Sequence, residues 1–206
     1  MTHRRDVLTM MAGVGLAAFT LGLPASAQQA PAGETAPLTE MAIGDPDAPI
    51  EIIEYASLTC SHCGTFHNTT YPLLKERYVE TGKVRFIIRE FPLDPLALGA
   101  FMLARCEEDK YWPIIDMLFE KQREWAYVDR PLDALAQMMR QAGFSQEKFK
   151  GCLRDEAVHD GIIAVRAEGE RRGVNSTPTF FIDGERYTGA MSIEEFERIL
   201  APKIGG

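Results

Sequence analysis

The chain has 206 residues, of which 46% are hydrophobic and 25% are charged, and its formal net charge at pH 7 is −8. This length allows a single domain with a substantial buried core. The acidic balance argues against nucleic acid and anionic membrane surfaces as partners, because both attract an excess of Lys and Arg.

The N-terminal stretch has the organisation of an export signal. Arg4 and Arg5 precede a largely uncharged stretch over residues 7–23, and residues 25–27 (Ala-Ser-Ala) form a small-x-small cleavage site. We therefore predict a cleavable signal peptide over residues 1–27 and a periplasmic mature protein. The paired arginines leave the twin-arginine and the general secretory routes both open. An uncleaved membrane anchor is disfavoured, because the stretch is short and interrupted by glycine.

Residues 28–38 have the composition of a flexible linker, so one domain is expected over residues 39–206. Its first strand is predicted at about 50–55, after a turn with two prolines. A helix then follows from residue 60 to about 80, and Pro72 should kink it because proline lacks a backbone donor.

The remaining elements follow from composition and spacing. Residues 83–91 are rich in branched and aromatic side chains and predict a second strand. Helical spacing dominates from about 94 to 172, and a hairpin is expected over 179–188 because Asp183-Gly184 is a two-residue turn signal. Ser192 stands three residues before a glutamate, which predicts a capped final helix to about residue 200.

The tetrapeptide Cys60-Ser61-His62-Cys63 follows the first strand directly and starts the predicted helix. Two thiols at this spacing can form and break a disulfide, although a zinc site and a static disulfide also fit a CxxC. At the helix start the sulfur of Cys60 can accept hydrogen bonds from free backbone amides. The positive end of the helix and a protonated His62 then favour the thiolate, which predicts a lowered pKa for Cys60.

Three segments together resemble the DsbA-type members of the thioredoxin superfamily: Gly44-Asp45-Pro46-Asp47-Ala48-Pro49, the CxxC, and Ser176-Thr177-Pro178-Thr179-Phe180-Phe181-Ile182-Asp183-Gly184. The resemblance covers about residues 39–202. It implies an α/β, thioredoxin-like fold, in which a central mixed sheet is flanked by helices and a helical insertion follows the second core strand.

The resemblance also implies roles for particular residues. The Thr177-Pro178 bond would be cis and face the CxxC, where the Thr177 backbone would pair with an extended substrate; the alternative is an ordinary turn. Glu54 would be a buried acid that moves protons to and from the resolving thiol, whereas the plain alternative is a solvent-facing strand glutamate. Ser61 replaces the proline common in the family, which leaves the strength of the oxidant open.

Cys106 and Cys152 fall in the predicted helical insertion, and some relatives carry a second disulfide there. We expect these two cysteines to form a structural disulfide, with two buried free thiols as the alternative. Cys60, Cys63 and His67 could offer three metal ligands, but a structural zinc site takes four. We therefore expect no metal site, and expect His67 to be packed or at the surface.

The leading hypothesis is periplasmic dithiol–disulfide exchange, in which a Cys60–Cys63 disulfide oxidises cysteine pairs of exported proteins. Expected partners are exported proteins with reduced cysteines and a DsbB-like membrane protein that reoxidises the pair. No cofactor is needed, because the redox-active disulfide stores both electrons, and the protein is expected to be a monomer. A disulfide isomerase or reductase on the same fold is the enzymatic alternative. A copper or zinc carrier that uses the CxxC is the non-enzymatic one.

Overall fold

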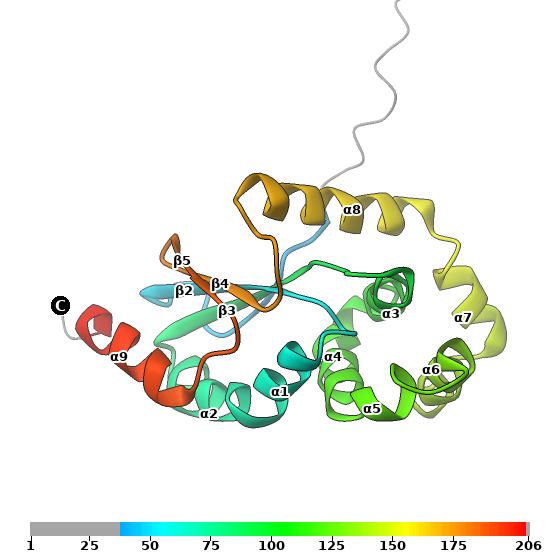
Figure 1. The fold of residues 1–206 in the computed structure, drawn as a ribbon, viewed down its shortest axis with the longest axis horizontal. Helices are drawn as coiled ribbons and strands as arrows, with labels where there is room; N and C mark the ends of the chain where they lie inside the picture. The colour runs from blue at the N-terminus through cyan, green and yellow to red at the C-terminus, as the bar shows by residue number, and fades with distance from the viewer. Residues whose placement is uncertain (1–37, 205–206) are drawn as a thin grey trace, which may run out of the picture. The chain divides into compact units, whose positions relative to one another are not determined.

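The computed structural model describes residues 38–204, so the predicted signal peptide over 1–27 and the linker up to residue 37 lie outside the described residues. Within 38–204 the strands form a five-stranded sheet in the order β1-β3-β2-β4-β5 (Figure 1). The strands are β1 (Met41–Ile43), β2 (Ile50–Ala56), β3 (Val84–Glu90), β4 (Thr179–Ile182) and β5 (Glu185–Thr188). β2 and β3 are parallel and the other neighbours are antiparallel, so the mixed sheet expected from the sequence is confirmed.

The short strand β1 is an addition to the predicted element order. It pairs antiparallel with β3, and Met41 lies opposite Ile88. Three residues are too few to show the alternation by which a strand is recognised from sequence. Pairing with β3 therefore fixes this segment, rather than any local preference.

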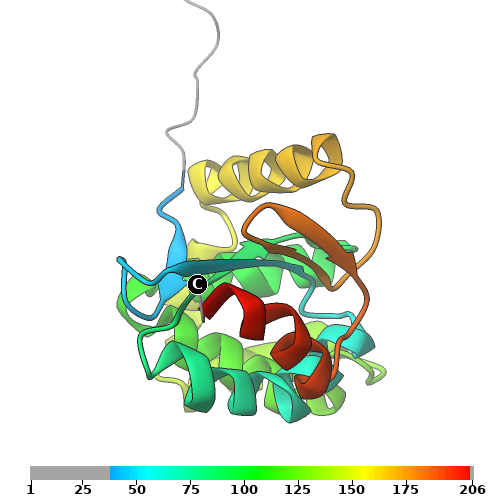
Figure 2. The same cartoon turned by 90° about the vertical axis from the view of Figure 1, so that its left-hand side faces the viewer.

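Alternate side chains of the strands point to opposite faces of the sheet, and both faces are buried. One face packs against α1 (Ser61–Thr69), α2 (Tyr71–Leu74) and α9 (Ile193–Ile204), and α8 (Glu156–Arg171) covers the other (Figure 2). The first face carries Ile50, Ile52, Val84, Phe86, Phe180 and Ile182, and the second carries Ile53, Tyr55, Ile87 and Phe181. α8 approaches closely at Gly169, where a Cβ would lie 2.7 Å from the Tyr55 ring.

The helix predicted from residue 60 to 80 is interrupted where proline removes a donor. α1 ends at Thr69, α2 starts at Tyr71 with Pro72 in its first turn, and a π-helical turn follows over Lys75–Val79. Gly82 then takes a positive φ of 72° and ends the segment. The interruption at Thr70 lies two residues before Pro72, whereas a kink at Pro72 itself stays a prediction.

The helical insertion lies between β3 and β4, as expected. Its helices are α3 (Pro95–Arg105), α4 (Tyr111–Glu120), α5 (Gln122–Trp125), α6 (Pro131–Gln141), α7 (Gln146–Cys152) and α8, with a 3₁₀ turn over Glu108–Lys110. Side chains cap three of them: Asp94 accepts from the Ala97 amide, Ser145 from that of Lys148, and Asp155 from that of Val158. Among residues 38–204, no helix combines the length and the apolar character needed to cross a membrane.

The C-terminal hairpin and helix form as their turn and cap residues predict. Asp183 and Gly184 both have positive φ, 47° and 84°, as a two-residue hairpin turn requires. Ser192 and Glu195 exchange backbone–side-chain hydrogen bonds of 2.8 and 3.3 Å, which is a capping box. The final helix runs to Ile204, four residues beyond the predicted end.

Candidate active site

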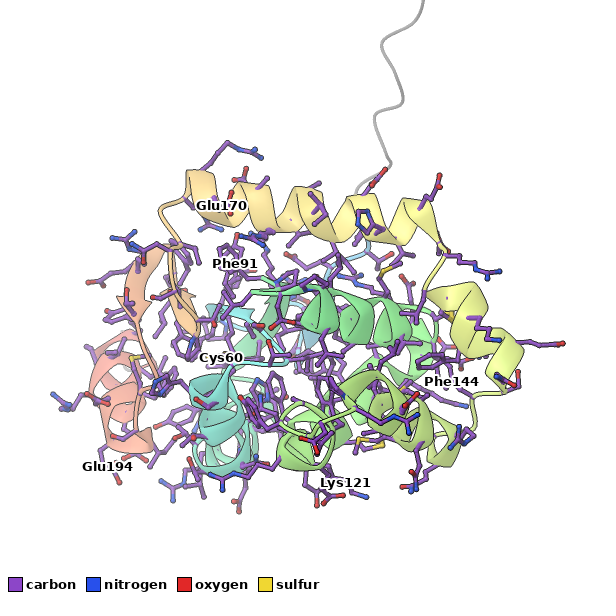
Figure 3. All side chains as sticks on the ribbon, turned by 45° about the vertical axis from the view of Figure 1, so that its right-hand side comes forward. Cys60, Phe91, Lys121, Phe144, Glu170 and Glu194 are labelled. Atoms are coloured by element: carbon purple, nitrogen blue, oxygen red, sulfur yellow. A yellow bond between two sulfur atoms is a disulfide. The ribbon has the colours of Figure 1, made fainter. Side chains whose placement is uncertain are left out.

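Cys60 lies at the end of the loop after β2 and directly precedes α1, close to the centre of the molecule as viewed in Figure 3. Its backbone is extended (φ −81°, ψ 120°), and its thiol donates a 3.2 Å hydrogen bond to the carbonyl of Thr177. Thr177 lies 117 positions away in sequence and is joined to Pro178 by a cis peptide bond. The fold therefore brings the CxxC and the Thr177-Pro178 loop together.

The surroundings of Cys60 favour its thiolate. They lower its pKa from the ordinary 9.0 to about 5. The largest cause is a hydrogen bond from the Cys63 side chain; partial burial opposes it, and the Thr177 side chain and the backbone amides of Cys63 and His62 add to the lowering. At pH 7 Cys60 is consequently charged.

Cys63 has the opposite character. It is fully buried in the first turn of α1, and it forms no disulfide with Cys60 in this structure. Burial, followed by the hydrogen bond with Cys60 and the charge of Glu54, raises the pKa of Cys63 well above its ordinary value. The pair is therefore asymmetric, with a reactive outer sulfur and a protonated inner one.

Glu54 and His67 form a buried pair beneath the cysteines. Glu54 follows Ile52 on the sheet face that meets α1, and its side chain is fully buried. Its Oε2 lies 2.8 Å from Nε2 of His67, whose ring stacks on Phe119 with centroids 3.9 Å apart. Glu51, one position before Ile52, instead leaves 46% of its side chain exposed and pairs with an arginine.

The other members of the CxxC are at the surface. Ser61 and His62 are exposed, and His62 contributes its backbone amide to the environment of Cys60. A role for the His62 imidazole stays a prediction.

The insertion holds the active-site loop through residues that no sequence motif indicated. Nε2 of the buried Gln122 donates to the carbonyls of Leu58 and Cys60, at 2.8 and 2.9 Å. The hydroxyl of Tyr127 donates to the carbonyl of Thr59 at 2.6 Å. These contacts hold the three consecutive carbonyls of the loop up to Cys60, so the insertion helps to position Cys60.

Gly64 makes the approach of Gln122 possible. A Cβ at Gly64 would lie 2.3 Å from Oε1 and 2.9 Å from Cδ of Gln122. A side chain at this position would therefore displace the amide of Gln122.

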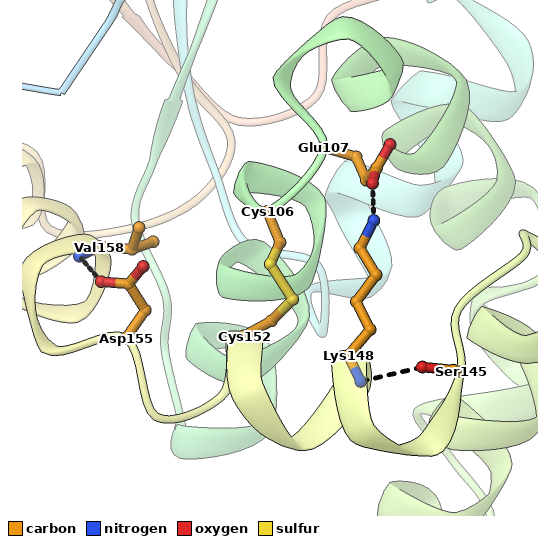
Figure 4. The surroundings of a disulfide bond; sticks show 7 residues. All are labelled: Cys106, Glu107, Ser145, Lys148, Cys152, Asp155 and Val158. Atoms are coloured by element: carbon orange, nitrogen blue, oxygen red, sulfur yellow. Dashed lines mark hydrogen bonds and ion pairs between the residues drawn. A yellow bond between two sulfur atoms is a disulfide. The ribbon is translucent and has the colours of Figure 1, made fainter.

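Cys106 and Cys152 are joined by a disulfide, with their Cα atoms 5.8 Å apart (Figure 4). The bond links the end of α3 to the last residue of α7 across 46 positions of sequence. An ion pair between Glu107 and Lys148 lies beside it. The bond therefore crosslinks the helical insertion, away from the CxxC in sequence.

His67, the third ligand considered for a metal site, has Nε2 bonded to Glu54 and its ring stacked on Phe119. In the part of the chain that the structure describes, no group of three or more His, Cys, Asp and Glu side chains is placed to hold a metal ion.

A mixed sheet with a CxxC at the start of its first helix, facing a cis-proline loop, defines a thioredoxin-fold thiol–disulfide protein. The family model described as Thioredoxin matches residues 36–201. Crystalline Wolbachia pipientis alpha-DsbA1 is 32% identical with a TM-score of 0.75, over 82% of this chain and 93% of that one. The chain belongs to the DsbA-type thiol:disulfide oxidoreductases of the thioredoxin superfamily.

Other relatives agree with this assignment. A Rickettsia typhi protein named among the protein-disulfide oxidoreductases is 30% identical over 162 residues, which is 77% of this chain and 60% of the relative. A protein-disulfide isomerase from Novosphingobium aromaticivorans is 21% identical with a TM-score of 0.72, over 81% of this chain and 98% of that one, and shows the shared fold. The chain spans about 60% of the length of the curated relatives it matches first.

Proposed function

We propose that the protein oxidises cysteine pairs of exported proteins through a disulfide between Cys60 and Cys63. The observation that carries this proposal is the contrast between the two sulfurs, because the pKa of Cys60 is lowered to about 5 while that of Cys63 is raised. A stabilised Cys60 thiolate favours the reduced pair. The disulfide is then a strong oxidant, because its reduction gives a stabilised thiolate.

The reaction starts from the oxidised protein. A substrate thiolate attacks the sulfur of Cys60, a mixed disulfide forms, and Cys63 leaves. A second substrate thiolate then attacks the substrate sulfur and releases Cys60 as a thiolate. Two electrons pass from the substrate to the protein; of the two substrate protons, one is taken up by Cys63 and the other is released to solvent.

Two further groups have roles in this scheme. The backbone of Thr177, beside the Cys60 sulfur, pairs with an extended substrate segment in the manner of an added strand. Glu54, buried and close enough for its charge to raise the pKa of Cys63, handles the proton of that thiol. The disulfide between Cys106 and Cys152 stabilises the insertion.

The setting follows from the signal predicted over residues 1–27. The mature protein works as a monomer in the periplasm, on exported clients with reduced cysteines, and a DsbB-like membrane protein reoxidises it. The cysteine pair holds both electrons, so the reaction needs no metal or organic cofactor.

The test is equilibration of the protein with reduced and oxidised glutathione, which gives the reduction potential of the Cys60–Cys63 pair. Thioredoxin has a reduction potential of about −270 mV. We expect the Cys60–Cys63 pair to have a far more oxidising potential. A potential near thioredoxin's would refute the oxidase assignment and favour a reductase or isomerase. Cys60→Ser is the control, because it leaves no attacked sulfur and should abolish exchange.

A further inference from the structure

The thiol of Cys63 is shielded from solvent, although the proposed reaction requires it to gain and lose a proton. Cys63 is fully buried, and so is Glu54, the acid whose charge acts on it. In each catalytic cycle Cys63 gains a proton when the substrate is oxidised and loses one when the pair is reoxidised. A group that connects Glu54 to the surface would give this proton a route, and neither Cys63 nor Glu54 is exposed.

His67 occupies this position. Its Nε2 bonds to Oε2 of Glu54 at 2.8 Å, whereas its Nδ1 is buried without a hydrogen-bond partner among residues 38–204. Oε1 of Glu54 likewise has no hydrogen-bond partner within this part of the chain, and the charge of Glu54 acts on Cys63. Stacking on Phe119 and contact with the Tyr71 ring fix the orientation of the imidazole.

His67 also lines a surface groove of about 280 Å³ between α1, α2 and α4, although its side chain is only 1% exposed. Lys75, Asp116 and Glu120 also line this groove, so charged side chains border it. Burial raises the pKa of Asp116, against the opposing effects of Lys75 and His67. The groove thus places ionisable groups next to His67, with only a thin layer of the protein between the buried imidazole and solvent.

We propose that His67 carries protons between this groove and Glu54, and thereby controls how fast Cys63 is protonated and deprotonated. When Cys63 leaves as a thiolate it takes a proton from Glu54, Glu54 takes the Nε2 proton of His67, and the buried Nδ1 takes up a proton that enters by way of the groove. Reoxidation runs the same steps in reverse. This inference rests on the proposed function, because it concerns the second cysteine of that reaction.

The test is chemical rescue in His67→Ala. This substitution removes the imidazole from beside the groove and leaves space of its size next to Glu54. The readout is the rate at which glutathione is released from a mixed disulfide on Cys60. In this step Cys63 attacks as a thiolate, so it must lose its proton. General acid–base groups contribute on the order of 10²-fold or more, so we expect a loss of about that size, with the rate restored in proportion to added imidazole base.

Matched variants separate proton transfer from folding. His159→Ala, at an exposed position of α8, should match the wild type with or without imidazole. His67→Gln can keep a hydrogen bond to Glu54 but cannot relay a proton, so it should be slow and gain nothing from imidazole. If His67→Ala does not fold, the rate of glutathione release from His67→Gln tests the proposal instead.

The outcomes distinguish the two proposals. A wild-type protein that exchanges no disulfide would refute the proposed function, whatever the variants do. A wild type that exchanges, together with a His67→Gln rate equal to the wild type or a slow, folded His67→Ala that imidazole does not restore, would overturn the proton route alone.

Discussion

Replacing Cys63 by alanine should raise the pKa of Cys60. The hydrogen bond from the Cys63 side chain is the largest of the effects that lower this pKa to about 5. A hydrogen bond to a charged group contributes about 1.5–3 kcal/mol, and 1.36 kcal/mol corresponds to one pKa unit. We therefore expect the pKa of Cys60 to rise by about one to two units in Cys63→Ala.

The same interaction predicts how the stability of the reduced protein depends on pH. Folding lowers the pKa of Cys60 from 9.0 to about 5, so the thiolate stabilises the folded reduced protein increasingly from pH 5 to pH 9. Between pH 5 and pH 7, which is two pH units, this stabilisation grows by about 2.7 kcal/mol. Because the sulfur is only half-buried, solvent screening reduces this to about 1–2 kcal/mol.

The assay is the ultraviolet absorbance of the thiolate as a function of pH, for the reduced wild type, Cys63→Ala and Cys60→Ala. Urea unfolding at pH 5 and pH 7 gives the matching stabilities. Relative to the oxidised protein, the reduced wild type should lose about 1–2 kcal/mol as the pH falls from 7 to 5. An unchanged Cys60 titration in Cys63→Ala would refute the assigned cause, and a titration that persists in Cys60→Ala would show that another group is observed.

Three further predictions concern positions around the pair. Replacing both Cys106 and Cys152 by serine should lower the free energy of unfolding by about 3–4 kcal/mol while exchange persists; unchanged urea denaturation would contradict a structural role. Gly64→Ala should cost about 1–3 kcal/mol through its clash with Gln122, and adding Gln122→Ala should recover part of that loss in thermal melts; strictly additive losses would argue against the clash. His62→Ala should raise the thiolate pKa if its imidazole stabilises the charged sulfur, and an unchanged absorbance titration would limit His62 to its backbone amide.

The features that could be read from the sequence are those in which local chemistry decides the backbone. The turn at Asp183-Gly184 and the box formed by Ser192 and Glu195 each use residues a few positions apart, so pattern and structure agree. The pairing of strands in a mixed sheet followed from the resemblance. By contrast, β1 forms only because β3 offers it a partner, and no three-residue pattern can show that.

The site divides in the same way. The four-residue spacing of Cys63 and His67 correctly indicates one helix face, but the partner of His67 is Glu54 on β2, which only the packing of α1 on the sheet reveals. Gln122 and Tyr127 reach the active-site loop from more than 60 positions away. Polar residues on a helical stretch usually face solvent, so nothing in their spacing distinguishes these two.

The junction of α4 and α5 contacts both His67 and the loop that carries Cys60. Phe119, in the last turn of α4, stacks on His67, and Gln122, the first residue of α5, holds the carbonyl of Cys60; Lys121 marks this junction in Figure 3. In the proposed scheme, the charge of Cys60 sets how strongly the disulfide oxidises, whereas the path through His67 sets how fast Cys63 exchanges its proton. Because one short segment contacts both, substitutions at the junction should change the thiolate pKa and the rate of glutathione release together. Substitutions at His67 should change the rate with little effect on Cys60, and a His67 variant that altered both equally would show that the two sulfurs are not controlled separately.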